Sequence, residues 1–305
     1  MRLASLRVSG DEVLAVVAGN DWLAASEAVP AGARTMAELI AGGPAGLGAL
    51  RRAATPVVVA DRGRPLAGIE MLAPVPRPGK IVAIGRNYRE HATEEGVEPP
   101  PAPLMFAKWP SAVVGPGAEI RWDPDLTIQV DYEAELAVVI GRGARRIRPE
   151  QALDHVLGYT CLNDVSARDL QFGDGQWTRG KSLDTFSPMG PVLVTADEIG
   201  DPQDLAITCT VGDERVQEAR TSAMYFGIAE IISACSRSFT LEPGDVIATG
   251  TPGGVGVFRD PPRFLGDGDR VVVEIEGIGR LENVCRHERV GAARARATQP
   301  AEATA

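Results

Sequence analysis

Three acidic residues alternate with apolar ones in the segment VDYEAELAVVIG, which runs from Val130 to Gly141. Successive side chains of a β-strand point to opposite faces, so Asp131, Glu133 and Glu135 are expected on one face. Carboxylates two positions apart on that face start about 7 Å from each other. This spacing suits a divalent cation, which would neutralise charges that otherwise repel. The competing interpretation is a solvated edge strand that binds nothing.

Length and composition indicate a soluble globular protein. The 305 residues can bury a substantial core in one large domain or two modest ones. The net charge of −10 argues against a nucleic-acid partner. No apolar run approaches the ~20 residues of a membrane span. Asp11 and Glu12 precede the apolar run 13–17, where a secretory signal would be basic or apolar. We therefore predict a cytoplasmic protein that does not bind membranes.

The cysteines narrow the choice of metal. Cys161, Cys209, Cys235 and Cys285 are widely spaced and form no C-x-x-C pair. This spacing supports neither a soft-metal site nor a disulfide framework, so buried free thiols are expected. Any metal here is expected to be hard and bound by oxygen.

Composition along the chain predicts three parts. Residues 1–73 are expected to form a small N-terminal α/β cap domain, with strands at 3–8 and 13–17 and a helix at 35–54 that Gly42, Gly43 and Pro44 interrupt. The proline-rich segment 73–79 marks the boundary with a catalytic domain at 74–290. Residues 291–305 lack periodicity and are expected to be a disordered tail.

The catalytic domain is expected to be rich in β-structure. Strands rich in Val and Ile alternate with Gly and Pro turns, 271–284 reads as a hairpin, and the best helix candidates are 149–155 and 221–236. This pattern favours an α+β fold with a rolled sheet over a parallel βαβ series.

Four further blocks accompany the acidic segment: GRNYREH at 85–91, GYTCLNDVSARD at 158–169, KSLDTFSPMGP at 181–191 and GDVIATGTPGGVG at 244–256. Together the five blocks resemble the fumarylacetoacetate hydrolase family, in its bacterial form with a small cap, over roughly residues 74–290. The resemblance implies a metal-dependent enzyme built on a rolled sheet.

The resemblance adds Asp164 to Glu133 and Glu135 as a third metal ligand. Three carboxylates without a nearby His or Cys indicate Mg²⁺ or Mn²⁺, with Ca²⁺ as an alternative. Taken alone, Asp164 would be read as an Asx-turn or a helix cap. Asp131 shares the predicted face, and we expect it on the surface or in a supporting role. The resemblance also implies that Lys181 points its charge at the metal site, where it balances the carboxylates.

His91 and Glu94 form a candidate catalytic pair. If the loop 85–96 winds into a helical turn, their spacing of three residues brings the side chains together. A carboxylate beside an imidazole fixes its tautomer and raises its basicity, as a general base for water requires. Glu95 is the competing partner, and only the family pattern favours Glu94. The alternative is an exposed surface pair.

Several residues are candidates for substrate contacts. The hydroxyl of Thr251, in a glycine-rich loop, could grip a substrate carboxylate, although turn structure alone would explain the glycines. The resemblance assigns carboxylate and carbonyl contacts to Arg86 and Gln171. Weaker candidates are Lys108 and Ser111, which could instead stabilise their loop, and Trp177 and Arg179, which could shape the pocket.

We predict hydrolysis of a C–C bond in a small 2-oxo or 1,3-diketo acid of the acylpyruvate type. The cation would stabilise an enolate, and the His91–Glu94 pair would activate water. Two alternatives use the same site, oxaloacetate decarboxylation and isomerisation or tautomerisation of a 2-hydroxy-dienoate. A distant alternative is a metal-binding scaffold without turnover. By the habit of the family we also expect a homodimer.

Overall fold

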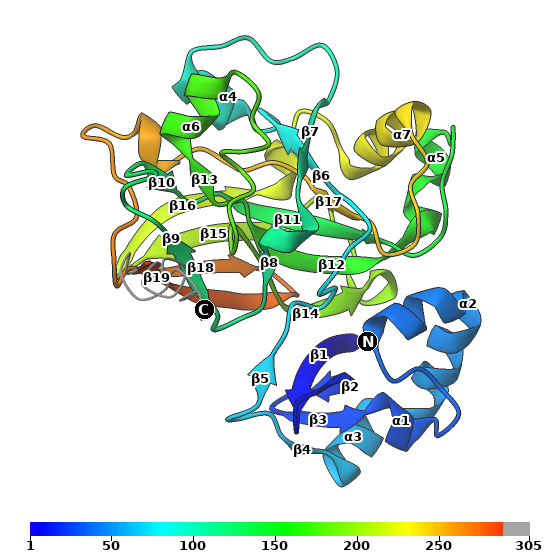
Figure 1. Ribbon diagram of the computed structural model, residues 1–305. Coiled ribbons are helices and arrows are strands. Elements are labelled where there is room, and N and C mark those ends of the chain that lie inside the picture. Colours follow the sequence, from blue (N-terminus) through cyan, green and yellow to red (C-terminus); the bar gives the residue numbers. More distant parts are fainter. Residues whose placement is uncertain (289–305) are drawn as a thin grey trace, which may run out of the picture.

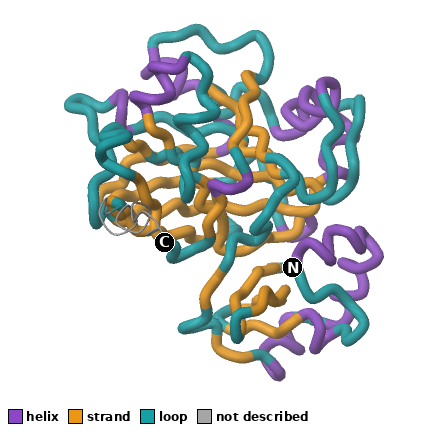
Figure 2. Tube along the Cα trace, viewed as in Figure 1, coloured by secondary structure: helices purple, strands orange, loops and turns teal. Residues whose placement is uncertain are grey.

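The computed structural model describes residues 1–288. A large body built around β-sheets carries a smaller lobe formed by the N-terminal residues (Figure 1). Strands fill the middle of the large body, while its longer helices lie at the rim (Figure 2). The predicted tail at 291–305 lies outside the described residues.

The N-terminal lobe begins with an antiparallel hairpin and ends with short helices. The turn at Ser9 and Gly10 joins the first two strands, and α2 starts after Thr35, whose hydroxyl accepts a hydrogen bond from the Glu38 N–H at 3.2 Å. Gly43, with φ of 56°, breaks α2 as the sequence predicts. The elements are β1 (Arg2–Val8), β2 (Asp11–Ala18), β3 (Asp21–Ala24), α1 (Ala25–Ala28), α2 (Met36–Ala53), α3 (Pro56–Arg62), β4 (Arg64–Pro65) and β5 (Glu70–Met71).

One 12-stranded sheet runs through both parts, in the order β4-β3-β2-β1-β14-β12-β11-β17-β6-β7, with β5 paired to β1 and β8 to β14. Strand β1 pairs antiparallel with β14, so the N-terminal strands extend the sheet of the larger body. The added strands are β6 (Ile81–Gly85), β7 (Leu104–Lys108), β8 (Val113–Val114), β11 (Ala134–Ile140), β12 (Val156–Asn163), β14 (Ser187–Thr195) and β17 (Val246–Ala248).

A 5-stranded sheet with the order β16-β15-β18-β19-β9 packs against the large one. Its strands are β9 (Glu119–Trp122), β15 (Ala206–Val211), β16 (Glu214–Arg220), β18 (Arg270–Ile275) and β19 (Gly279–His287), and the last two form the predicted hairpin. Every residue of β11 is buried. The side chains of β11 alternate between two hydrophobic cores. Val138 lies in the core that also contains Ile207 of the 5-stranded sheet, and Ala137 lies in the second core. This double burial fixes the strand that leads to the acidic residues.

Short helices complete the fold: α4 (Arg89–Glu95), α5 (Pro149–Ala152), α6 (Arg168–Asp174), α7 (Ile228–Ser238), η1 (Pro110–Ala112), η2 (Leu153–His155), η3 (Ala196–Glu198), η4 (Thr221–Ala223) and η5 (Gly256–Phe258). The predicted helix at 149–155 is present as α5 and η2. The predicted start at Thr221 is wrong, because α7 begins only after Gly227, whose N–H donates to the Glu230 carboxylate at 2.9 Å.

The acidic segment is not the single strand that the alternation predicts. Strand β10 (Val130–Asp131) pairs with β13 (Ser166–Ala167) in a separate sheet, and β11 resumes only at Ala134. In between, Tyr132 N–H donates to Asp131 Oδ1 at 2.8 Å and Glu133 N–H to Asn163 Oδ1 at 3.0 Å. Side-chain acceptors therefore replace a neighbouring strand. The solvated-edge interpretation is also wrong, since the acidic side chains are buried.

The predicted α+β fold class is confirmed by this arrangement. All four cysteines of the described chain are buried and unpaired, as expected. Within residues 1–288, no helix is long and apolar enough to cross a membrane.

Candidate metal centre and active site

The structure brings Glu133, Glu135 and Asp164 together. One carboxylate oxygen from each lies within 4.8 Å of the others, and all three residues are buried. The register that pairs Ala134 with Asn163 places the end of β12 beside the start of β11, and Asp164 N–H donates to the Glu133 carbonyl at 2.9 Å. Three buried carboxylates suit a hard divalent cation of the Mg²⁺, Mn²⁺ or Ca²⁺ type.

The electrostatics of the triad also fit a cation. Burial opposes ionisation of Glu133, but Lys181 and Arg168 outweigh it and lower the Glu133 pKa to about 2. Burial raises the pKa of Glu135 well above its ordinary value, and the charges of Asp164 and Glu133 raise it further. A divalent cation would offset this repulsion directly, because opposite charge favours the ionised carboxylate.

Two buried lysines hold Asp164. Lys181 Nζ lies 2.7 Å from Glu133 Oε2 and 3.1 Å from Asp164 Oδ2. It thus lies beside two of the three candidate metal ligands, and its role there stays a prediction that the family resemblance implies. Lys108 Nζ lies 2.6 Å from Asp164 Oδ1 and donates to the carbonyls of Val165 and Lys181. Burial lowers the pKa of Lys108, although Asp164 opposes the shift. Lys108, treated as a weaker candidate from sequence, is therefore a full member of the cluster.

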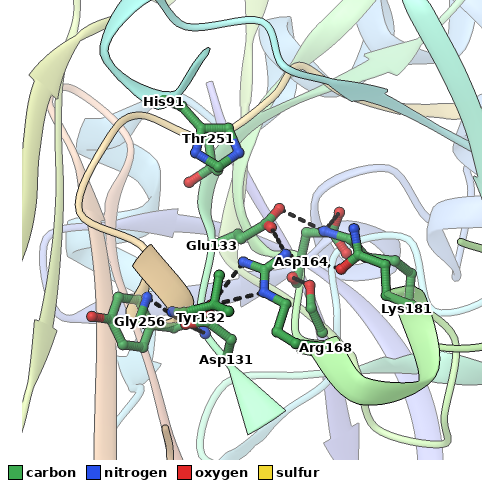
Figure 3. A network of polar contacts seen from close by, with 12 residues as sticks. His91, Asp131, Tyr132, Glu133, Asp164, Arg168, Lys181, Thr251 and Gly256 are labelled. Atoms are coloured by element: carbon green, nitrogen blue, oxygen red, sulfur yellow. Dashed lines mark hydrogen bonds and ion pairs between the residues drawn. The ribbon is translucent and has the colours of Figure 1, made fainter. Parts of the chain in front are cut away.

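Arg168 was missed by the sequence analysis. Its guanidinium bridges Asp131 Oδ2 and Glu133 Oε1, both at 2.8 Å (Figure 3). Its Nη1 donates to Gln171 Oε1 at 3.0 Å. Asp131 is fully buried and acts as the counter-charge of Arg168, not as a surface residue. The sequence does contain a signal for a second cation, because buried carboxylates require paired cations and Lys181 alone cannot balance several of them.

The cluster is nearly balanced in charge. Four buried carboxylates face three buried cations, which leaves a net charge of −1 when all are ionised. The carboxylates are Asp131, Glu133, Glu135 and Asp164, and the cations are Lys108, Arg168 and Lys181. Addition of a divalent cation would make the site net positive and ready for an anionic ligand.

His91 lies on α4 above this cluster (Figure 3). Its side chain is buried, and its Nδ1 lies 3.9 Å from Glu94 Oε2 without a hydrogen-bond partner among the described residues. Glu94 Oε1 accepts a hydrogen bond from Gly254 N–H at 2.7 Å. Glu95, the competing partner, pairs instead with Arg86. The geometry therefore leaves Glu94 as the carboxylate beside His91.

A cavity of about 20 Å³ lies between α4 and the acidic cluster. Its lining includes the three main candidates for substrate contacts, Arg86, Gln171 and Thr251, together with His91, Glu133 and Lys181. The weaker candidates Lys108 and Ser111 do not line it. This volume suffices for about one water molecule and is far below the ~300 Å³ of a small ligand site. Substrate entry therefore requires its walls to move. A larger cleft of about 1530 Å³ lies elsewhere and touches none of the predicted site residues.

Two of the weaker candidates differ in position. Trp177 lines the cavity and packs edge-on against Phe106, with ring centroids 5.3 Å apart. Arg179 does not line the cavity and forms an exposed ion pair with Asp174 at 2.5 Å.

Comparison with known proteins identifies the family. The family model described as fumarylacetoacetate (FAA) hydrolase C-terminal matches residues 80–286. The chain belongs to the fumarylacetoacetate hydrolase family. It is 47% identical over 253 residues to the mitochondrial oxaloacetate tautomerase FAHD2B of Bos taurus, with 82% of this chain and 79% of that protein covered.

Two further family members are similar. Oxaloacetate tautomerase YisK of Bacillus subtilis (strain 168) is 48% identical over 221 residues, which cover 72% of this chain and 73% of that protein. The solved structure of a fumarylacetoacetate hydrolase from psychrophilic Exiguobacterium antarcticum has a TM-score of 0.81 and 38% identity, and the match covers 94% of this chain and all of that one. These relatives are named as enzymes, and the prediction that this family member is an enzyme is confirmed.

In this member of the fumarylacetoacetate hydrolase family, Asp131 also anchors the turn at η5. Asp131 accepts hydrogen bonds from Gly256 N–H at 2.8 Å and Val257 N–H at 3.1 Å. A Cβ at Gly256 would lie 1.9 Å from the Arg263 carbonyl oxygen, so only glycine fits there. The turn carries Phe258, whose ring packs against His91 at a centroid distance of 6.0 Å. Asp131 therefore connects Arg168 to a wall of the cavity.

We expect Asp131→Asn to weaken Mn²⁺ binding about tenfold or more, because it leaves the Arg168 charge without its partner and free to compete for Glu133. Isothermal titration of the metal measures this effect. The matched control is Asp125→Asn, an exposed residue on the preceding loop. Unchanged Mn²⁺ affinity in the Asp131 variant would show that Arg168 does not depend on Asp131.

Asn87 fastens the start of α4 to the metal centre, and no sequence pattern had singled it out. Its side-chain amide donates to the Thr249 carbonyl at 2.8 Å and the Phe226 carbonyl at 3.1 Å, and its oxygen accepts from Phe226 N–H. Gly250, which follows Thr249 in the chain, donates from its N–H to Glu135 Oε2 at 2.9 Å. A Cβ at Gly250 would lie 2.7 Å from Asn87 Cβ, so glycine permits this close packing.

Proposed function

We propose that this chain is a divalent-metal-dependent tautomerase that interconverts the enol and keto forms of oxaloacetate or a closely related dicarboxylic 2-oxo acid. One observation carries the proposal: a buried histidine with an unpartnered ring nitrogen shares its cavity with Glu133 and Lys181. The 47–48% identity to two oxaloacetate tautomerases supports the choice of substrate.

The reaction moves one proton and leaves no other net change. The enol hydroxyl at C2 loses its proton, C3 gains one, and the C2–C3 double bond becomes a C2 carbonyl. His91 would carry the proton to or from C3, and Glu94 Oε2, which lies 3.9 Å from His91 Nδ1, would orient the ring. Lys181 and Arg168 bring positive charge to the side of the cavity where the oxygen of the enolate would lie.

Glu133, Glu135 and Asp164 would hold the divalent cation. When bound, the cation supplies Lewis-acid stabilisation of negative charge on the substrate oxygens. Gln171 and Thr251 complete the polar lining, and their own hydrogen bonds to Arg168 and Gln217 fix their orientation. The side chains of Phe106, Trp177 and Phe258 exclude bulk water from the same space.

Hydrolysis of an acylpyruvate, the activity first predicted from the sequence, is the second candidate. It is supported by the carboxylate of Glu94 beside His91, which would help the imidazole to activate water, and by the 38% identity to a solved hydrolase. Hydrolysis differs from tautomerisation because water must reach a remote carbonyl and a C–C bond must break.

The test compares substrates on Mn²⁺- and Mg²⁺-loaded protein. We expect rapid ketonisation of enol-oxaloacetate, followed by its ultraviolet absorbance, and little pyruvate from acetylpyruvate or oxaloacetate. His91→Asn is expected to lower the ketonisation rate by about 10²–10⁴-fold while Mn²⁺ affinity is retained, since general acid–base catalysis contributes about this factor. His155→Asn, which changes a half-buried histidine outside the cavity, is the control.

The outcomes separate the candidates. Faster release of pyruvate from acetylpyruvate than ketonisation of oxaloacetate would favour the hydrolase. Decarboxylation without ketonisation would favour a decarboxylase. Stabilisation of the fold by Mn²⁺ with no further effect of oxalate would favour the non-catalytic scaffold. The homodimer remains part of the proposal, and light scattering after size exclusion measures it.

A further inference from the structure

Arg86 and Glu95 form an ion pair inside the wall of the active-site cavity. Arg86 Nε lies 2.8 Å from Glu95 Oε2, and Arg86 NH2 contacts Glu95 Oε1, so the guanidinium holds the carboxylate with two parallel bonds. Both residues line the cavity with Glu133 and Lys181. Their side chains are 29% and 15% exposed, which makes the pair partly shielded from solvent. A guanidinium fork of this kind is the side-chain arrangement that best recognises a carboxylate.

The position of Arg86 is set by its surroundings as well as by Glu95. The residue has φ of 57°, a left-handed conformation that is uncommon for residues other than glycine. Its guanidinium lies 5.6 Å from the centroid of the Trp177 ring, which also lines the cavity. The adjacent Asn87 ties the backbone to Thr249 and Phe226. Arg86 is therefore held by the body of the protein, whereas Glu95 belongs to the last turn of α4.

We propose that Glu95 occupies the subsite for the remote carboxylate of a dicarboxylic keto acid. When such a substrate binds, its remote carboxylate replaces Glu95 on Arg86, and α4 shifts to make room. The cavity of about 20 Å³ requires some such movement, and the exchange of one carboxylate for another leaves the charge of Arg86 paired throughout. A substrate with a single carboxylate cannot make this exchange, so the site selects diacids. This inference rests on the proposed function and adds the residues by which the site would select a diacid.

The experiment measures binding of inert ligands to Mn²⁺-loaded protein by isothermal titration. L-malate and L-lactate both offer a 2-hydroxy acid to the metal, and they differ by the remote carboxylate of malate. Oxalate, which has no remote group, reports on the metal site alone. The variants are Arg86→Gln and Glu95→Gln. The control is Glu90→Gln, which makes the same charge change at an exposed position of α4 that does not line the cavity.

We expect Arg86→Gln to weaken malate binding about 10–100-fold, as for loss of a charge-assisted bidentate contact, and to change lactate and oxalate binding less than about twofold. Glu95→Gln removes the competing charge and is expected to strengthen malate binding about 3–10-fold, the range of a partly exposed ion pair. Glu90→Gln is expected to have no effect on any ligand.

Equal weakening of malate and lactate by Arg86→Gln would overturn the inference, as would a Glu95→Gln variant that binds malate no more tightly than the wild type. Failure of oxalate to bind the wild-type protein would instead refute the proposed function, because the metal site would then not accept a chelating acid. The two failures are therefore distinguishable.

Discussion

Asp164→Ala is expected to abolish Mn²⁺ binding and to lower the free energy of unfolding of the metal-free protein by about 3–5 kcal/mol, as for other broken buried ion pairs. The carboxylate pairs with Lys108 at 2.6 Å and with Lys181 at 3.1 Å, and none of the three side chains is more than 3% exposed. Its removal leaves Lys108 without its carboxylate partner in a buried position. Metal titration and urea denaturation measure the two effects.

The matched control is Asp184→Ala, which removes the same group from an exposed position near Lys181 in sequence. The second variant, Asp164→Asn, keeps the shape of the side chain and separates loss of charge from loss of packing. Retained Mn²⁺ binding in Asp164→Ala would refute the three-carboxylate site. A loss of stability no larger than that of Asp184→Ala would show that the lysines are solvated and not buried as described.

Local patterns in the sequence predict much of the fold, because they report interactions between residues close along the chain. The hairpin at the C-terminal end follows from alternation and a Gly-containing turn, and the break in α2 follows from Gly43 and Pro44. The break between β10 and β11 could not be predicted in this way. It depends on Asn163, which lies 30 residues further along the chain and whose side chain accepts a hydrogen bond from Glu133 N–H.

The metal ligands illustrate the same limit. Alternation alone relates Glu133 to Glu135, but only the pairing of Ala134 with Asn163 brings Asp164 to them. The family resemblance supplied that third residue, since no local pattern encodes strand register over this distance. Arg168 lies inside the segment 158–169, but no local pattern indicates its role, because that role depends on contacts with Asp131 and Glu133 more than thirty residues earlier in the chain.

The balance of charge would couple the binding of the metal to the binding of the substrate. With Glu135 protonated, the three remaining carboxylates match the three cations, so the metal-free site is neutral. A divalent cation that displaces this proton changes the net charge to +1. An anionic keto acid would then meet a positive, buried site, and without metal the same acid would meet a neutral one. Metal binding would therefore be accompanied by release of the Glu135 proton.

Glu135→Gln is expected to stabilise the metal-free protein at neutral pH while it abolishes the stabilisation by Mn²⁺. Burial first, and then the charges of Asp164 and Glu133, raise the Glu135 pKa well above its ordinary value of 4.5. At a pH above 4.5, Glu135 of the unfolded chain loses its proton, whereas Glu135 of the folded protein keeps it. The stability of the metal-free wild type should therefore fall by about 1.4 kcal/mol per pH unit from this one group, until Glu135 also ionises in the folded state.

Thermal and urea denaturation of EDTA-treated protein between about pH 5 and about pH 8 measure this dependence, since glutamine has no proton to lose over that range. The gain in stability of Glu135→Gln over the wild type should grow with pH and vanish towards 4.5, the ordinary pKa of the group. Glu274→Gln, at an exposed position of β18, is the control and should show no such trend.

In the wild type, stabilisation by Mn²⁺ should instead increase with pH, because metal binding displaces the proton. A wild type that becomes more stable than Glu135→Gln as the pH of the metal-free solution rises would mean that Glu135 is already ionised in the folded protein, and that the cations around it outweigh its burial.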